Sequence, residues 1–238
     1  MGAEFKREKK KVWLVSFINA LQRLIPLSKE KKFRFFLRME WIFDRLAHEK
    51  SFQYLRPEQH PFRKYSFRFM DENIPENSTI LDFGSNYGVI SCHLSKRAKR
   101  VVGIDHDPDA INSAKLNYNA ENLEFIQTDA FEYLNKNEKE FDVLILSHIL
   151  EHLDNREEFL NRYKRFFKFI YIELPDFDKN YLNHCRKEIG DELIYTDNDH
   201  VVEFDRDELL TLLEKCNIKV RVSEYRFGLI KLWCETGS

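Results

Sequence analysis

After Pro75 the chain alternates between short apolar runs and amphipathic helical segments, and this alternation restricts the fold more than any other feature. We expect strands at 78–83, 100–104, 123–127, 141–146, 169–174, 218–225 and 229–235, and helices at 89–96, 108–117, 131–136, 156–167 and 206–216. The run 141–146 is almost wholly apolar, which is typical of a strand that helices cover on both faces. The last two strands flank Gly228 and form an antiparallel pair. The pattern predicts an α/β fold with a doubly wound, mostly parallel seven-stranded sheet and an antiparallel last strand.

The first 75 residues show helical rather than strand periodicity. Trp13, Phe17 and Leu21 recur at intervals of four residues, which predicts a helix over 12–25 that Pro26 ends. Two further helices are expected at 31–48 and 62–72, and the stretch 175–202 is an insertion for which we predict no element. We therefore divide the chain into a helical extension or cap, 1–75, and a ligand-binding α/β domain, 76–238.

Charge is distributed unevenly along the chain. Residues 1–70 carry 17 Lys and Arg against 7 Asp and Glu, whereas residues 71–238 carry 21 against 33. Because contacts to phosphates need a positive surface, the acidic body argues against a nucleic-acid partner. The basic residues Lys6–Lys11, followed by the Trp13 face of the first helix, are compatible with peripheral contact to an anionic membrane; packing on a partner or on the chain itself is the alternative.

The sequence also bears on compartment and metal content. It has no uncharged apolar run of about 18 residues, so we expect no membrane span. Its four cysteines lie far apart without a CxxC pair, which favours reduced thiols in a cytoplasmic protein. Carboxylates at Glu173, Asp176, Asp178, Asp197 and Asp199 would suit a hard cation. Acidic surface loops are commoner than such sites, and we expect no metal.

The stretch Ile80–Gly88 combines a strand with a glycine-bearing loop. The strand ends in Asp82-Phe83-Gly84, and Gly88 opens the next helix after three intervening residues. Gly84 permits a tight turn, and Gly88 lets the helix and a ligand approach the backbone closely. The spacing differs from the dinucleotide fingerprint G-x-G-x-x-G, and the charge of Asp82 would repel a pyrophosphate. A cationic ligand fits better.

This loop resembles the glycine loop of the class I S-adenosylmethionine-dependent methyltransferases, and the resemblance extends over about 78–235. It implies that Asp105, at the end of the second strand, accepts both ribose hydroxyls, and that Asp129 accepts the adenine amino group. The tail Leu150–Leu153 is similar to that of small-molecule members of the family. The cofactor contacts that the resemblance implies are Asp82, Gly84, Ser85, Asn86, Tyr87, Gly88, Asp105, His106, Asp129, Ala130, Phe131, Ser147 and His148.

The roles of Asp105 and Asp129 each have a simpler alternative. Asp105 could belong only to a helix start, although Asp107 before Pro108 already makes a good cap, and Asp129 could merely cap the helix that follows it. Asn86 stands where the family usually has a further glycine. Asn tolerates a positive φ better than most residues, so the turn can form. The departure keeps a non-catalytic relative open as an alternative.

Three histidines are the candidate catalytic bases. Methyl transfer is an in-line displacement, and a hydroxyl acceptor benefits from a base that titrates near neutral pH. His148 follows the fourth strand directly, His152 lies four residues later and would share a helical face with it, and His200 belongs to the insertion that would roof the site. The alternative is that His148 and His152 only pack in their loop.

The function predicted from the sequence is transfer of a methyl group from S-adenosylmethionine to a hydroxyl of a small molecule or glycan. The acidic body and the resemblance to small-molecule members favour this acceptor class. One alternative is a non-catalytic methyltransferase-like binding protein. The other is a nicotinamide-dependent oxidoreductase, against which the glycine spacing and the antiparallel terminal pair both count.

Overall fold

The computed structural model describes residues 12–57, 59–136, 141–194 and 199–237. Contacts between residues divide the chain into two compact units, Met1–Asp44 and Arg45–Ser238. The division falls within one long helix, α2 (Lys29–Tyr54). The functional division at residue 75 stays a proposal.

The first unit contains α1 (Trp13–Leu24) and the beginning of α2. None of the residues of α1 is buried, and the side chains of Trp13, Phe17 and Leu21 are exposed. Lys6–Lys11, the basic part of the candidate membrane-binding segment, lies outside the described residues, so membrane contact stays a hypothesis beside packing on a partner or on the chain itself. Within the described ranges, no helix is both long enough and apolar enough to cross a bilayer.

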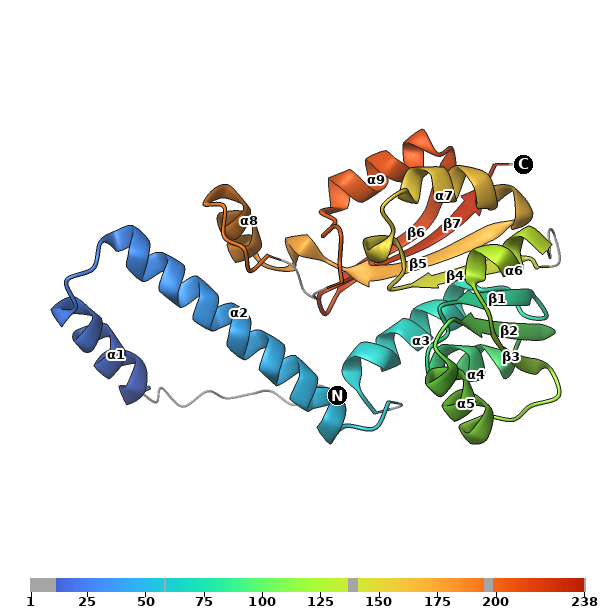
Figure 1. Cartoon of the computed structure of the whole chain (residues 1–238), viewed down its shortest axis with the longest axis horizontal. Coiled ribbons are helices and arrows are strands. Elements are labelled where there is room, and N and C mark those ends of the chain that lie inside the picture. Colours follow the sequence, from blue (N-terminus) through green and yellow to red (C-terminus); the bar gives the residue numbers. More distant parts are fainter. Residues whose placement is uncertain (1–11, 58, 137–140, 195–198, 238) are drawn as a thin grey trace. The chain divides into compact units, whose positions relative to one another are not determined.

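The second unit is built on a seven-stranded sheet with the order β3-β2-β1-β4-β5-β7-β6 (Figure 1). The strands are β1 (Thr79–Phe83), β2 (Arg100–Asp105), β3 (Leu123–Gln127), β4 (Val143–Ser147), β5 (Phe169–Pro175), β6 (Ile218–Arg226) and β7 (Leu229–Thr236). Strands β1 to β5 pair in parallel, and β7 runs antiparallel to both β5 and β6. The predicted fold class is confirmed, including the antiparallel last strand.

Helices cover both faces of this sheet (Figure 1). They are α3 (Pro61–Asn73), α4 (Val89–Ser95), α5 (Pro108–Asn117), α6 (Ala130–Lys136), α7 (Arg156–Tyr163) and α9 (Arg206–Lys215), whereas α8 (Tyr181–Glu188) lies apart from the sheet faces. Side chains of α3, α4 and α5 pack on one face, and those of α6, α7 and α9 pack on the other. Neighbouring residues of β1 divide between these layers, with Ile80 on the α3–α4 side and Leu81 on the opposite side.

Local signals in the sequence explain most element boundaries. The Asp107 side chain accepts a hydrogen bond from the Asp109 backbone and Pro108 occupies the first position of α5, as predicted. The four apolar residues 143–146 of β4 are all buried, as expected for a strand covered on both faces. The expected helix 156–167 is shorter, because a 3-10 turn at Lys164–Phe166 follows α7.

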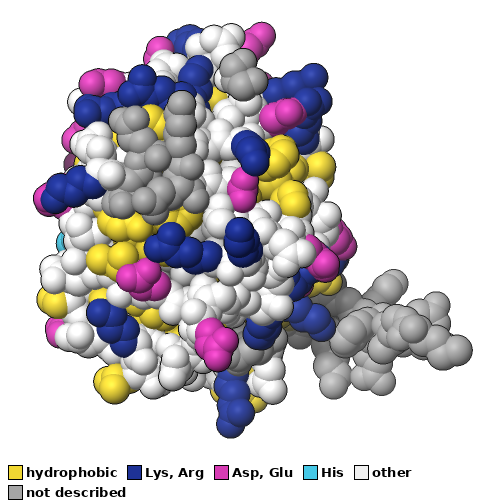
Figure 2. All heavy atoms as spheres, turned by 90° about the vertical axis from the view of Figure 1, so that its right-hand side faces the viewer, with side chains coloured by type: hydrophobic (Ala, Val, Ile, Leu, Met, Phe, Trp, Pro, Cys, Tyr) yellow, Lys and Arg dark blue, Asp and Glu magenta, His cyan; other side chains and the backbone are white. Residues whose placement is uncertain are grey.

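Figure 2 shows the side of the structure that lies at the right of Figure 1. Basic and acidic side chains are interspersed on it, with hydrophobic side chains between them, as on an ordinary solvated surface. In Figure 1 the arrowheads of β4 and β5 point away from this side. The carboxyl ends of the parallel strands, where ligands bind in doubly wound sheets, therefore lie opposite it.

Candidate functional site

The loop between β1 and α4 requires glycine at two positions. Gly84 has φ 74° and Gly88 has φ 78°, both in the left-handed region. A Cβ on Gly84 would lie 2.5 Å from the Ile149 side chain, and one on Gly88 would lie 2.5 Å from the Phe125 ring. Asn86, at the position of the family's further glycine, adopts φ 47°, so asparagine supports the turn as expected.

Asp105, at the end of β2, joins this loop to the sheet. Its Oδ2 accepts a hydrogen bond from the Asn86 backbone N–H at 2.8 Å, and its Oδ1 accepts one from the Asp107 N–H at 3.0 Å. Asp107 caps α5, so Asp105 is not itself the helix cap, and its contact to the ribose hydroxyls stays a prediction. Each carboxylate oxygen has further acceptor capacity, which suits a pair of hydroxyls. The exposed His106 ring lies beside it, with Nδ1 3.4 Å from Asp105 Oδ1.

Asp129 lies at the next strand end, after β3. It is exposed, and its Oδ1 accepts a hydrogen bond from the Glu132 N–H at 2.9 Å, so it does cap α6. A capping carboxylate retains a second oxygen, and its contact to adenine stays a prediction. Phe131 lies edge-on to the Phe83 ring at a centroid distance of 5.9 Å, while Ala130 is half-buried. These two side chains supply an apolar surface next to Asp129.

Two polar side chains lie buried under the glycine loop. Asp82 is 2% exposed and its Oδ2 accepts a hydrogen bond from the Ser91 hydroxyl at 2.5 Å. Burial raises the pKa of the Asp82 carboxyl to about 6, against the lowering effect of the Ser91 hydrogen bond. Ser85 Oγ is also buried, and it has no hydrogen-bond partner among the described residues. Tyr87, in contrast, is exposed.

Asp82→Asn is expected to remove a pH dependence of stability. Because the pKa of Asp82 is raised from 3.8 to about 6 on folding, its protonation favours the folded state. This contribution is complete below pH 4 and is lost as the pH rises through about 6, an effect on the order of 2–3 kcal/mol. Urea unfolding at pH 4 to 8 measures it. The free energy of unfolding of the wild type minus that of Asp82→Asn should fall over this range, and a constant difference would contradict the assignment.

His148, at the end of β4, lies between two buried carboxylates. Its backbone N–H donates to the Glu173 carbonyl at 2.7 Å, and the residue has a positive φ of 57°. Its ring Nδ1 lies 3.1 Å from Glu151 Oε1, and its Nε2 lies 3.8 Å from Glu173 Oε1. The Phe62 ring of α3 stacks at a centroid distance of 6.0 Å. These contacts hold the imidazole at the carboxyl end of the sheet.

Glu173 was not predicted as part of the candidate catalytic site. It stands opposite Ser147 in the β4–β5 register, and its carboxylate accepts hydrogen bonds from the Tyr171 hydroxyl at 2.6 Å and the Ser147 hydroxyl at 3.3 Å. A fully buried glutamate at the end of an apolar strand is an unusual residue for that position. That mismatch was the signal available in the sequence.

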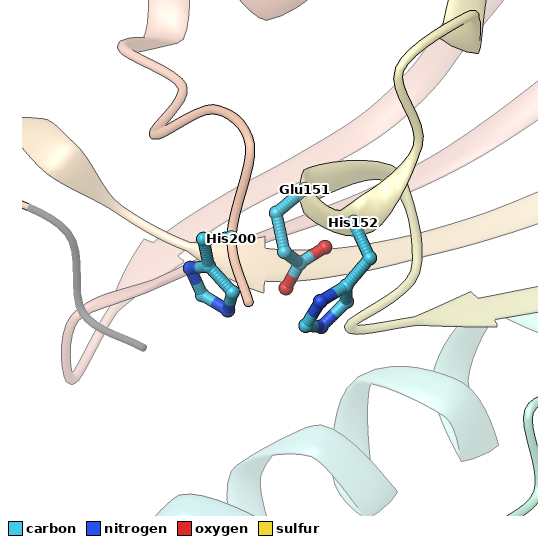
Figure 3. Close-up of side chains that lie close together, drawn as sticks. All are labelled: Glu151, His152 and His200. Atoms are coloured by element: carbon cyan, nitrogen blue, oxygen red, sulfur yellow. The ribbon is translucent and has the colours of Figure 1, made fainter. Parts of the chain in front are cut away.

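The expectation that His148 and His152 share a helical face is wrong. Leu150–His152 form a 3-10 turn, and the positive φ of His148 directs the chain away from a regular helix. His152 instead packs against His200, with ring centroids 4.7 Å apart and planes at 82°. Figure 3 shows three side chains that point toward one another. Glu151 and His152 come from the 3-10 turn after β4, and His200 comes from the loop before α9.

A surface cavity of about 940 Å³ lies elsewhere, at α7 and α9. Its lining includes Arg156, Thr211 and Lys215, and none of the residues predicted to bind the cofactor or act in catalysis. It is therefore not the site at the ends of β1, β2 and β4.

Known proteins match this part of the chain. Residues 81–168 match the family of the methyltransferase domain. An uncharacterised RNA methyltransferase of Mycoplasma mobile is 35% identical over 82 residues, which cover 32% of this chain and 22% of the relative. The chain spans only between 20% and 50% of the length of the curated relatives that it matches.

Two solved structures show the same fold. The magnesium protoporphyrin IX methyltransferase of Synechocystis, with bound S-adenosylhomocysteine, superposes with a TM-score of 0.54 at 15% identity, covering 73% of this chain and 81% of that one. The mitomycin 7-O-methyltransferase superposes with a TM-score of 0.57 at 15% identity, covering 75% and 55%. The matched domain, the strand order and these superpositions together show that the chain has the fold of the class I S-adenosylmethionine-dependent methyltransferases.

Proposed function

We propose that the protein transfers a methyl group from S-adenosylmethionine to a hydroxyl group of a small molecule or glycan. The observation that carries this proposal is the position of His148 between Glu151 and Glu173, at the carboxyl end of β4. The next residue, Ile149, packs directly on Gly84, so the histidine borders the glycine loop.

The residues of the loop fit the cofactor. Gly84 and Gly88 let the loop lie directly against the Ile149 and Phe125 side chains, and the Asp105 carboxylate accepts a hydrogen bond from the same loop. Ser85 Oγ is a buried polar atom without a partner among the described residues, available to a ligand. Asp105 would hold the ribose hydroxyls, Asp129 the adenine amino group, and the backbone of the loop the amino-acid end.

Methyl transfer then depends on how the acceptor oxygen is positioned against the methyl group and on removal of the hydroxyl proton. When bound, S-adenosylmethionine supplies a methyl group on a positively charged sulfur. The acceptor oxygen forms a bond to the methyl carbon as the carbon–sulfur bond breaks, and the hydroxyl proton must leave. His148 takes this proton, because the carboxylates of Glu151 and Glu173 stabilise the imidazolium that forms.

The proposed acceptor class rests on the charge of the chain and on what similar proteins methylate. The mitomycin 7-O-methyltransferase supports a small-molecule hydroxyl, whereas the relative from Mycoplasma mobile is described as an RNA methyltransferase. The acidic body of this chain favours the former. A screen that includes RNA and protein distinguishes them.

The test begins with calorimetric titration of S-adenosylhomocysteine and, separately, NAD. Transfer of label from methyl-labelled S-adenosylmethionine to hydroxyl compounds, oligosaccharides, RNA and protein is then measured. We expect micromolar binding of S-adenosylhomocysteine, and label on a hydroxyl acceptor. His148→Asn should lower kcat by about 100-fold or more, since asparagine tolerates the positive φ but cannot act as the base.

His184 provides a matched control. It is a histidine paired with a carboxylate, Asp178, outside the site, and His184→Asn should keep full activity. Binding of NAD alone would support the oxidoreductase alternative. Binding of S-adenosylhomocysteine without transfer to any acceptor would support the non-catalytic one.

A further inference from the structure

Glu151, His152 and His200 bring two imidazoles and one carboxylate together at the carboxyl edge of the sheet. One ligand atom from each lies within 4.8 Å of the others (Figure 3). We propose that these three residues bind a divalent metal ion beside the methyl-transfer site. This assigns His152 and His200 as metal ligands rather than bases, and it revises the expectation of no metal.

The Glu151 carboxylate supplies a second, independent observation. Glu151 is 1% exposed, and its Oε2 has no hydrogen-bond partner among the described residues. Within the part of the chain that the structure describes, the ion pairs of Glu151 and of the fully buried Glu173 are both with His148. Two buried carboxylates sharing one imidazole are expensive to desolvate. A cation at the unpartnered oxygen would compensate this cost.

The other ring nitrogens of the two histidines are held as metal ligands require. His200 Nδ1 lies 2.8 Å from Glu203 Oε1, and the two side chains are only 6% and 4% exposed. His152 Nδ1 lies 3.3 Å from the Asp199 carbonyl. Such contacts orient imidazoles and fix their tautomers in metal centres.

Backbone hydrogen bonds keep the two segments together. The N–H groups of Val201 and Val202 both donate to the Glu151 carbonyl, at 2.9 and 3.3 Å. The loop that carries His200 is thereby attached to the turn that carries Glu151 and His152. Atoms bound tetrahedrally to one ion at about 2.1 Å lie about 3.4 Å apart. The three ligand atoms lie within 4.8 Å of one another, so the side chains need to draw in by up to about 1.4 Å.

The carboxylates first considered for a cation are otherwise engaged. Asp176 forms an ion pair with Arg206 at 2.6 Å, and Asp178 pairs with His184 at 2.6 Å. Asp197 lies outside the described residues. Both carboxylate oxygens of Asp176 and of Asp178 have hydrogen-bond partners, whereas Oε2 of Glu151 has none among the described residues.

The two imidazoles and the carboxylate indicate which metal ions this site would prefer. Calcium and magnesium prefer oxygen ligands, whereas two imidazoles and a carboxylate suit Mn²⁺, Fe²⁺, Co²⁺ or Zn²⁺. Three protein ligands leave coordination positions for an acceptor oxygen, whose hydroxyl would lose its proton to His148 more readily when metal-bound. This role rests on the proposed methyl transfer, but metal binding itself does not.

The test uses the full chain after treatment with EDTA and removal of the chelator. Calorimetric titration with Mn²⁺ and Zn²⁺, and the visible spectrum with Co²⁺, measure affinity and coordination. We expect one ion per chain, bound at least about 10-fold more weakly by His152→Asn and Glu151→Gln. His152 is partly exposed, so its replacement should not prevent folding. The control His184→Asn should bind as the wild type does.

S-Adenosylhomocysteine titrations of the same variants show whether each is folded. A wild type that binds none of these ions, or variants that bind them as tightly as the wild type, would overturn the proposal. If an ion binds at this site but S-adenosylhomocysteine does not, the metal site stands and the proposed function fails. If S-adenosylhomocysteine binds and methyl transfer is unchanged in EDTA, the function stands and the metal's catalytic role is wrong.

Discussion

Asp105→Ala is expected to lower the affinity for S-adenosylhomocysteine by about 100-fold or more. The carboxylate is proposed to accept both ribose hydroxyls, and it also accepts the backbone N–H groups of Asn86 and Asp107. Hydrogen bonds to a charged group contribute about 1.5–3 kcal/mol each, so losing the ribose contacts alone accounts for this factor. Release of Asn86 from β2 would add to the loss, because the glycine loop would no longer be preorganised.

Asp107→Ala is the matched control for this measurement. Asp107 lies two residues after Asp105 and caps α5 through the Asp109 N–H at 2.9 Å. Its removal should cost about 1 kcal/mol of stability and leave the affinity for S-adenosylhomocysteine unchanged. Calorimetric titration of both variants, with thermal unfolding to verify folding, separates the two roles. Equal affinity of folded Asp105→Ala and wild type would remove Asp105 from the cofactor site.

Gly88→Ala is expected to destabilise the fold by about 3 kcal/mol or more. The backbone at Gly88 has φ 78°, which costs an alanine about 1–2 kcal/mol. The added Cβ would also lie 2.5 Å from the Phe125 ring and 2.9 Å from the Ala114 Cβ. Overpacking of this kind costs about 1–3 kcal/mol more, since β3 and α5 enclose the position on both sides.

Gly190→Ala isolates the conformational part of that effect. Gly190 has φ 62°, but a Cβ there would meet no atom within 4 Å. It should lose only about 1–2 kcal/mol in urea-unfolding experiments, clearly less than Gly88→Ala. Equal losses in the two variants would show that the Gly88 loop relaxes around the methyl group, and that close packing does not require glycine there.

Short-range patterns determined most of the secondary structure before any contact was known. The apolar residues of β4, the cap and proline that open α5, and the paired glycines after β1 all act on their own few residues. Short-range patterns did not predict α8 (Tyr181–Glu188), which lies inside the stretch 175–202. It is a short helix whose eight residues include few apolar positions, so periodicity gave little signal.

The sequence by itself therefore determined the doubly wound sheet, its antiparallel last strand and the glycine loop with Asp105, because those features depend on local conformation and burial. Only the tertiary structure decided which polar side chains meet at the carboxyl edge. Glu173 reaches His148 because β4 and β5 are neighbours in register, and His200 reaches Glu151 because a distant loop bonds to the turn after β4. Such contacts depend on how separate segments pack, and spacing along the chain does not encode them.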